Sequence, residues 1–236
     1  SLPTALVLTG STICASPGGN GTITSTTSVS GVNYQLYNSG NATVQGVKAG
    51  TGSGLNWSTL AAGTGYYVKG TDATTSCVSP VSNTANVSTY PNPTITTGGT
   101  AAAVCYSAGA QTTTLAYTAT TNTPVSYSID WATLADQGNT SITFNAGGGT
   151  ITGITIPAAT AAGTYTGTMT ITNANGCTAT QAVSVTVNAL PSTTEISGNT
   201  APACNATGII YSVVPTSGSS YAWTVPAGAN ITAGST

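Results

Sequence analysis

A unit of about 100 residues repeats along this chain, and two cysteines frame each copy. The sequence Ala-Ala-Gly-Thr at residues 61–64 returns at residues 161–164, and Cys77 returns as Cys177. Near the start of each copy a proline precedes a cysteine by 11 to 13 residues, in the pairs Pro3 and Cys14, Pro93 and Cys105, and Pro191 and Cys204. Such a period is typical of tandem modules, each large enough to bury its own core.

Prolines also mark the junctions between copies, at residues 90–93 and 189–191. Proline fixes its φ angle and favours an extended, stiff connection, so we expect a rod rather than a compact globule. The predicted modules are residues 1–90, residues 91–189 and the opening half of a third at residues 190–236.

Between the junctions, apolar residues alternate with polar ones at the period of β-strands that have one buried face. Clusters of Gly, Asn, Ser and Pro separate these rows and supply tight turns, and no helical stripe of useful length occurs. This pattern predicts an all-β chain of tandem β-sandwiches. The apolar rows are Val32, Tyr34 and Leu36; Val125, Tyr127, Ile129 and Trp131; Tyr165, Met169 and Ile171; Val183, Val185 and Val187; Ile209, Tyr211 and Val213; and Tyr221, Trp223 and Val225.

Charged residues make up 3% of the chain, against about 25% in an ordinary domain. Two basic residues form no basic patch, so the counterion release that drives nucleic-acid binding is missing, as is attraction to anionic lipid. No apolar run is long enough for a membrane span. We therefore expect no nucleic-acid partner and no membrane insertion.

The five cysteines divide into one pair per complete module and one left over. This arithmetic predicts structural disulfides Cys14–Cys77 and Cys105–Cys177, with Cys204 unpaired and its partner expected beyond the last residue, Thr236. Each bond would close a loop of roughly 60–70 residues and contribute about 4 kcal/mol in the chain-entropy model. Disulfides indicate an oxidising compartment, and buried free thiols are the alternative.

No catalytic, cofactor or metal site is predicted. The chain has no histidine, so a Ser-His-Asp or Cys-His arrangement is absent, and the cysteines lack zinc-site spacing. Asp130 and Asp136 are interpreted as turn or capping residues rather than a glycosidase pair. The linkers contain no acidic residue, so calcium is not expected.

Exposed aromatic residues would provide a platform for a carbohydrate. Trp57, Tyr66 and Tyr67 are the candidates, since adjacent tyrosines on a strand point to opposite faces. Packing at a junction is the alternative for them. Trp131 and Trp223 fall in the apolar rows and are assigned to cores.

Several motifs resemble repeats of giant cell-surface adhesins of Bacteroidota, of the SprB type known from gliding motility. Residues 163–165 (GTY) and 170–177 (TITNANGC), followed by the valine strand, are similar to the closing half of such a repeat, and residues 31–34 and 60–64 match more loosely. Residues 221–229 (YAWTVPAGA) are similar to the opening half of a PKD-like module. The resemblance implies Ig-like or PKD-like sandwiches, export by the type IX system, and no catalytic residues.

The function predicted from the sequence is a structural spacer in a long secreted fibre or adhesin at the bacterial cell surface. Disulfides and the scarcity of Lys and Arg would make it resistant to proteases. Its partners would be neighbouring modules of the same polypeptide. The alternatives are a carbohydrate-binding adhesive module and a filament in which copies complete one another by strand donation. We expect the chain to be an interior piece of a longer secreted polypeptide; a mature, processed protein is the alternative.

Overall fold

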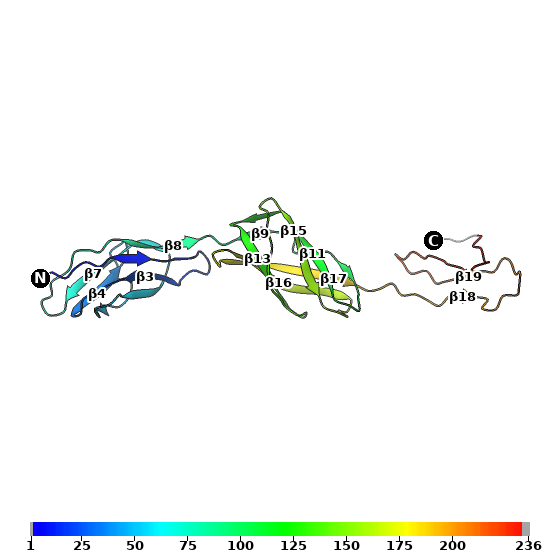
Figure 1. The fold of residues 1–236 in the computed structure, drawn as a ribbon, viewed down its shortest axis with the longest axis horizontal. Coiled ribbons are helices and arrows are strands. Elements are labelled where there is room, and N and C mark those ends of the chain that lie inside the picture. Colours follow the sequence, from blue (N-terminus) through cyan, green and yellow to red (C-terminus); the bar gives the residue numbers. More distant parts are fainter. Residues whose placement is uncertain (1, 233–236) are drawn as a thin grey trace.

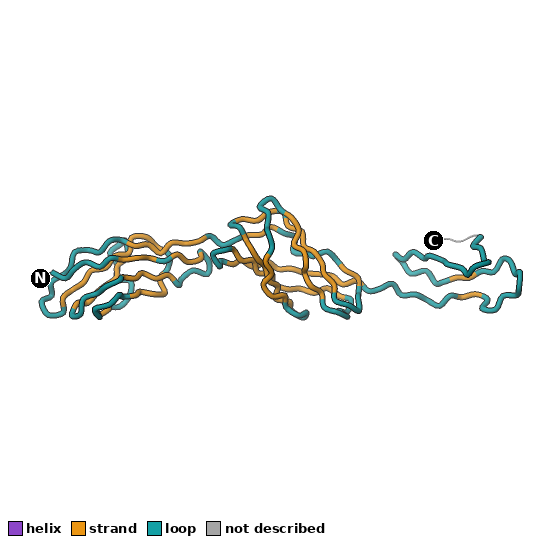
Figure 2. The backbone as a smooth tube through the Cα atoms, in the orientation of Figure 1, coloured by secondary structure: helices purple, strands orange, loops and turns teal. Residues whose placement is uncertain are grey.

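The computed structural model describes residues 2–232. In this range the chain contains strands and no helix, and it forms two β-sandwiches in tandem followed by an extended C-terminal stretch (Figure 1, Figure 2). The predicted all-β fold of tandem Ig-like or PKD-like sandwiches is confirmed. The expectations placed on Ser1 and Thr236 fall outside the described residues. Nowhere in residues 2–232 is there a helix with the length and apolar character of a membrane span.

The first sandwich packs a three-stranded sheet on a five-stranded sheet. The smaller sheet has the order β1-β3-β6 and comprises β1 (Leu8–Gly10), β3 (Gly21–Ser25) and β6 (Asn56–Leu60). The larger sheet has the order β2-β8-β7-β4-β5 and comprises β2 (Thr12–Cys14), β8 (Ala85–Tyr90), β7 (Gly63–Asp72), β4 (Val32–Tyr37) and β5 (Lys48–Ala49). Trp57 and Ile23 from one sheet meet Tyr34 and Leu36 from the other in a fully buried core.

The second sandwich repeats this arrangement. Its large sheet has the order β10-β17-β16-β13-β14 and comprises β10 (Val104–Cys105), β17 (Thr178–Asn188), β16 (Gly163–Asn173), β13 (Pro124–Trp131) and β14 (Gln137–Ser141). Opposite it lie two pairs of strands, β11 (Gln111–Tyr117) with β15 (Gly149–Ile156) and β9 (Thr94–Thr96) with β12 (Ala119–Thr121). Leu115, Ile151 and Ile154 from these pairs pack against Tyr127 and Val185 of the large sheet.

The repeated Ala-Ala-Gly-Thr sequence begins the same strand in both sandwiches. Gly63 pairs with Val87 and Gly163 with Val187, each beside the last strand. In both sandwiches a tyrosine hydroxyl donates a hydrogen bond to the carbonyl oxygen of the first alanine in this sequence. The distance is 3.1 Å from Tyr66 to Ala61 and 2.8 Å from Tyr165 to Ala161. The sequence repeat therefore reflects one structural position, the entry into the central strand of the large sheet.

The predicted apolar rows are buried in both sandwiches, except that Tyr165 is only partly buried and Val125 points outward. Val125 is 41% exposed, whereas Ser126 is 4% exposed. The register of β13 against β16 shifts between Pro124 and Ser126, and such a bulge reverses the alternation of side chains. The assignment of Val125 to the core was therefore wrong, while Tyr127 and the rest of its row point inward.

The stretch of residues 190–232 has a different character. Its only described strands are β18 (Ser197–Gly198) and β19 (Tyr211–Ser212), which pair antiparallel. None of its described side chains is buried, and Trp223 is half-buried outside any strand. The rows predicted at residues 209–213 and 221–225 thus line no core in the described part of the chain.

Candidate functional site

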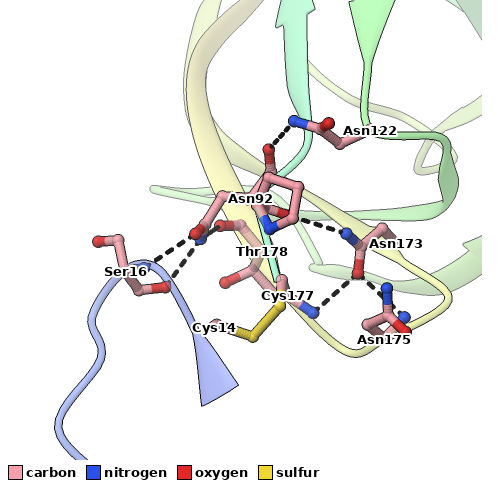
Figure 3. Close-up of a disulfide and its surroundings, with 9 residues drawn as sticks. Cys14, Ser16, Asn92, Asn122, Asn173, Asn175, Cys177 and Thr178 are labelled. Carbon is pink, nitrogen blue, oxygen red and sulfur yellow. Dashed lines mark hydrogen bonds between the residues drawn. A yellow bond between two sulfur atoms is a disulfide. The ribbon is translucent and has the colours of Figure 1, made fainter. Parts of the chain in front are cut away.

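The principal functional feature is a covalent bond between the two sandwiches. Cys14 of the first is disulfide-bonded to Cys177 of the second, with an S–S distance of 2.05 Å and a Cα–Cα distance of 5.4 Å (Figure 3). The predicted pairs Cys14–Cys77 and Cys105–Cys177 were therefore wrong. Cys77, Cys105 and Cys204 are free thiols in the described structure.

Strand topology explains why the predicted pairs do not form. Cys105 lies beside Asn188 at the end of β17, whereas Cys177 directly precedes the start of that strand. Eleven residues of strand separate the two positions, roughly 35 Å at about 3.3 Å per residue. A disulfide requires Cα atoms within about 7 Å. The two cysteines of each module thus occupy opposite ends of its sandwich.

Cys14 is placed at the junction by the short opening strand of the first sandwich. Strand β2 runs parallel to the last strand, β8, and Cys14 is paired in register with Tyr90, the last residue of β8. The next amide, of Ala15, donates a hydrogen bond to the Tyr90 carbonyl oxygen at 2.9 Å. The cysteine is therefore fixed beside the point where the chain leaves the first sandwich.

Cys177 is presented by the turn between β16 and β17. The Asn173 side chain, which is 4% exposed, organises this turn: its Oδ1 accepts hydrogen bonds from the amides of Asn175 and Cys177, both at 3.0 Å. Gly176 adopts a positive φ of 77°, which glycine tolerates well. Cys177 itself is fully buried. The turn thus holds the sulfur in one position against the neighbouring sandwich.

Asn92, in the linker, adds a polar clamp around the disulfide (Figure 3). Its Oδ1 accepts a hydrogen bond from the Ser16 amide at 2.9 Å, and its Nδ2 donates to the Ser16 carbonyl at 2.8 Å. The same Nδ2 donates to the Thr178 carbonyl at 2.6 Å. One amide side chain therefore bonds to both sandwiches.

Two further asparagines of the second sandwich hold the linker backbone. Asn122 Nδ2 donates to the Asn92 carbonyl at 2.7 Å, and Asn173 Nδ2 donates to the Pro91 carbonyl at 3.2 Å. Sequence analysis missed all three asparagines. The sequence did contain a signal for Asn92, which lies between two prolines. Because proline has no backbone N–H, hydrogen bonds that fix this junction have to come largely from the polar side chain between the prolines.

The turn that carries Cys77 lies at the other end of the first sandwich. Asp72 Oδ1 accepts hydrogen bonds from the amides of Thr74 and Thr75, at 2.9 and 2.8 Å. The backbone amide of Thr75, followed by that of Thr74, lowers the pKa of the Asp72 carboxyl group. Asp72 therefore occupies in the first sandwich the place that Asn173 occupies in the second.

The aromatic candidates do not form an open platform. Trp57 and Tyr66 lie in the first core, and Tyr67 is 8% exposed. Tyr67 stacks on Tyr37 with ring centroids 5.2 Å apart, and Lys69 Nζ lies 5.7 and 5.8 Å from the two ring centroids. These residues therefore pack within the first sandwich, and neither an open carbohydrate platform nor packing at a junction describes them.

The two acidic candidates of the second sandwich are separated in role. Asp136 Oδ1 accepts a hydrogen bond from the Trp131 amide at 2.9 Å, which caps the end of β13 as interpreted from the sequence. Asp130 lies on β13 itself and is exposed. Within residues 2–232, no group of three or more His, Cys, Asp or Glu side chains converges on a point.

Comparisons with known proteins give one family match and several similar solved structures. Residues 189–236 match the PKD-like domain family. No curated protein matches the chain. Among solved structures, it is similar to the fibronectin(III)-like modules of Clostridium thermocellum CbhA, with 13% identity over 79% of this chain and 92% of that one at a TM-score of 0.36.

Two other solved structures show similar values. The IG1 and IG2 domains of DIP-gamma match at 13% identity over 80% of this chain and 98% of that one, with a TM-score of 0.34. The FN1–FN3 domains of chicken CNTN1 match at 12% identity over 80% and 69%, with a TM-score of 0.39. The fold class itself rests on the strand order and cores described above. Sandwich modules with a disulfide are typical of extracellular proteins.

Proposed function

We propose that this chain is a load-bearing spacer of a long extracellular fibre or adhesin at a bacterial cell surface. The observation that carries the proposal is the Cys14–Cys177 bond, because it joins two sandwiches rather than closing one. The resemblance to Bacteroidota gliding-adhesin repeats supports the surface location and export by the type IX system. The PKD-like match at residues 189–236 supports a chain of successive modules.

The bond changes the path that a pulling force takes through the molecule. Residues 2–14 run along the first sandwich to the junction, and β17 runs from Cys177 along the second (Figure 1). Tension between the two ends therefore passes from Cys14 directly to Cys177. Cys14 and Cys177 are 163 positions apart in sequence, and the residues between them lie outside the covalent load path.

The surface also suits an exposed spacer. Lys48 and Lys69 are the only basic residues, so trypsin-like proteases have two cleavage sites, both within the disulfide-closed loop. Cleavage at either lysine would leave the pieces joined through Cys14 and Cys177. A net charge of −2 gives little long-range attraction for charged partners.

Single-molecule pulling from the two chain ends tests the proposal. The oxidised protein should yield little length from residues 15–176. The double variant Cys14→Ser with Cys177→Ser should release roughly 500 Å more, at about 3.4 Å per residue. Cys204→Ser serves as the matched control and should behave like the parent chain. Equal extension of the parent and the double variant would refute the load-bearing role of the bond.

A further inference from the structure

The free cysteine of the second sandwich occupies the same structural position as Cys14. Cys105 ends the short opening strand β10, which runs parallel to the last strand and pairs Cys105 with Asn188, the final residue of β17. The following amide, of Tyr106, donates to the Asn188 carbonyl at 2.8 Å, as Ala15 does to Tyr90 at 2.9 Å. The second sandwich therefore presents an exposed thiol at the end where the first forms its disulfide.

The free cysteine of the first sandwich likewise matches Cys177. The Asp72 amide donates to the Cys77 carbonyl at 2.9 Å, and the Asn173 amide donates to the Cys177 carbonyl at 3.0 Å. The residue before each cysteine has a positive φ, 56° at Ser76 and 77° at Gly176. Cys77 thus lies, like Cys177, in the closing turn between the central and the last strand of its large sheet, although its turn is one residue longer.

We propose that Cys105 and Cys77 are the two halves of a second inter-sandwich disulfide, formed head to tail between copies of this chain. The Cys14–Cys177 bond shows that this pair of local structures, an opening-strand end and a closing turn, reacts when one lies against the other. Cys77 and Cys105 lie at opposite ends of the two-sandwich unit, so they cannot pair within one copy. A second copy carries the missing half for each. The inference extends the proposed spacer function, since it supplies a covalent link between successive spacers.

The chemistry requires an oxidant, for which a small disulfide such as oxidised glutathione suffices. The Cys105 thiolate attacks the glutathione disulfide, forms a mixed disulfide and releases one glutathione thiolate. The Cys77 thiolate of the second copy then attacks the protein sulfur of that mixed disulfide and releases the other glutathione. Two protein thiols are oxidised and one glutathione disulfide is reduced to two thiols, so atoms and electrons balance.

The test uses the full chain with Cys204→Ser, in which Cys77 and Cys105 are the only free thiols. After incubation with a glutathione redox buffer, non-reducing electrophoresis should show a ladder of dimers, trimers and higher species. Random pairing would give twice as much Cys77–Cys105 peptide as either symmetric pair, Cys77–Cys77 or Cys105–Cys105. Peptide mapping by mass spectrometry should find the Cys77–Cys105 peptide well above this two-to-one ratio. The Cys14–Cys177 peptide should persist throughout.

Matched variants complete the design. Adding Cys77→Ser or Cys105→Ser should abolish every species larger than a dimer, because head-to-tail growth needs both thiols. A purely monomeric product, or symmetric Cys77–Cys77 and Cys105–Cys105 pairs at the random ratio, would overturn the proposal. Such a result would leave the Cys14–Cys177 load path intact, so it is distinguishable from failure of the pulling experiment.

Discussion

The two ends of the second sandwich differ in how they meet the rest of the chain. At the end that faces the first sandwich, Cys177 is bonded and buried, and Asn92 links the two modules. At the other end, Cys105 is exposed, and the linker position that corresponds to Asn92 is Leu190, 57% exposed. The strand positions at both ends are alike, so the contacts across the first junction come from the linker side chain Asn92 and the turn that carries Cys177 rather than from the sandwich fold alone.

The largest difference between the two ends should come from the disulfide. When one sandwich unfolds and the other stays folded, the disulfide closes a loop of roughly 80 residues in the unfolded part. The double variant Cys14→Ser with Cys177→Ser removes this restraint, which is worth about 4–5 kcal/mol to each sandwich in the chain-entropy model. Guanidinium denaturation followed by Trp57 and Trp131 fluorescence measures it. Both transitions should move to lower denaturant, while Cys204→Ser should move neither. An unchanged midpoint would show that the junction bond does not stabilise the modules.

The Asn92 clamp should have the next largest effect. Asn92→Ala removes three hydrogen bonds across the junction, each worth about 0.5–1.5 kcal/mol. In the variant that lacks the disulfide, hydrogen exchange at the Ser16 amide should accelerate, and small-angle scattering should report a wider range of inter-sandwich angles. Asn86→Ala is the control, because Asn86 bonds to Gly65 inside the first sandwich. Unchanged exchange at Ser16 would contradict the clamp.

A smaller effect is expected from exchanging the two turn residues. Asn173→Asp keeps the oxygen that accepts from Cys177 but loses the donor to the Pro91 carbonyl, so it should cost about 1 kcal/mol. The reciprocal Asp72→Asn change contacts no linker in this chain. Thermal unfolding of both variants at pH 7 measures the difference. Equal losses would mean that the Asn173 bond to the linker contributes nothing.

The smallest effect is a difference in acid response. The pKa of Asp72 is lowered in the folded state by the Thr75 and Thr74 amides, so its contribution is present above its unfolded pKa of about 3.8 and is lost as pH falls through the lower folded value. Asn173 does not titrate. Between pH 5 and 2, Trp57 fluorescence should therefore report more loss of stability than Trp131 fluorescence, and Asp72→Asn should reduce the gap. A gap that persists in that variant would have another cause.

Much of the fold was predictable because alternation of polarity is a local property. The rows that include Tyr34 and Val185 are buried as predicted, since each strand has one face in a core. Val125 was not predictable, because its bulge depends on the partner strand β16. The cysteine pairs failed for a similar reason. Equal spacing in sequence indicated equivalent positions but not which ends of the sandwiches those positions occupy.

One consequence follows from the route of the load. The strands on it, Leu8–Gly10, Thr12–Cys14 and Thr178–Asn188, are already drawn out almost to their full length, since a strand rises about 3.3 Å per residue. Between Leu8 and Asn188 the path therefore has almost no slack to take up. Tension applied at Leu8 would therefore reach Asn188 with almost no extension of the chain between them. The folded sandwiches beside the path would serve chiefly to keep it straight.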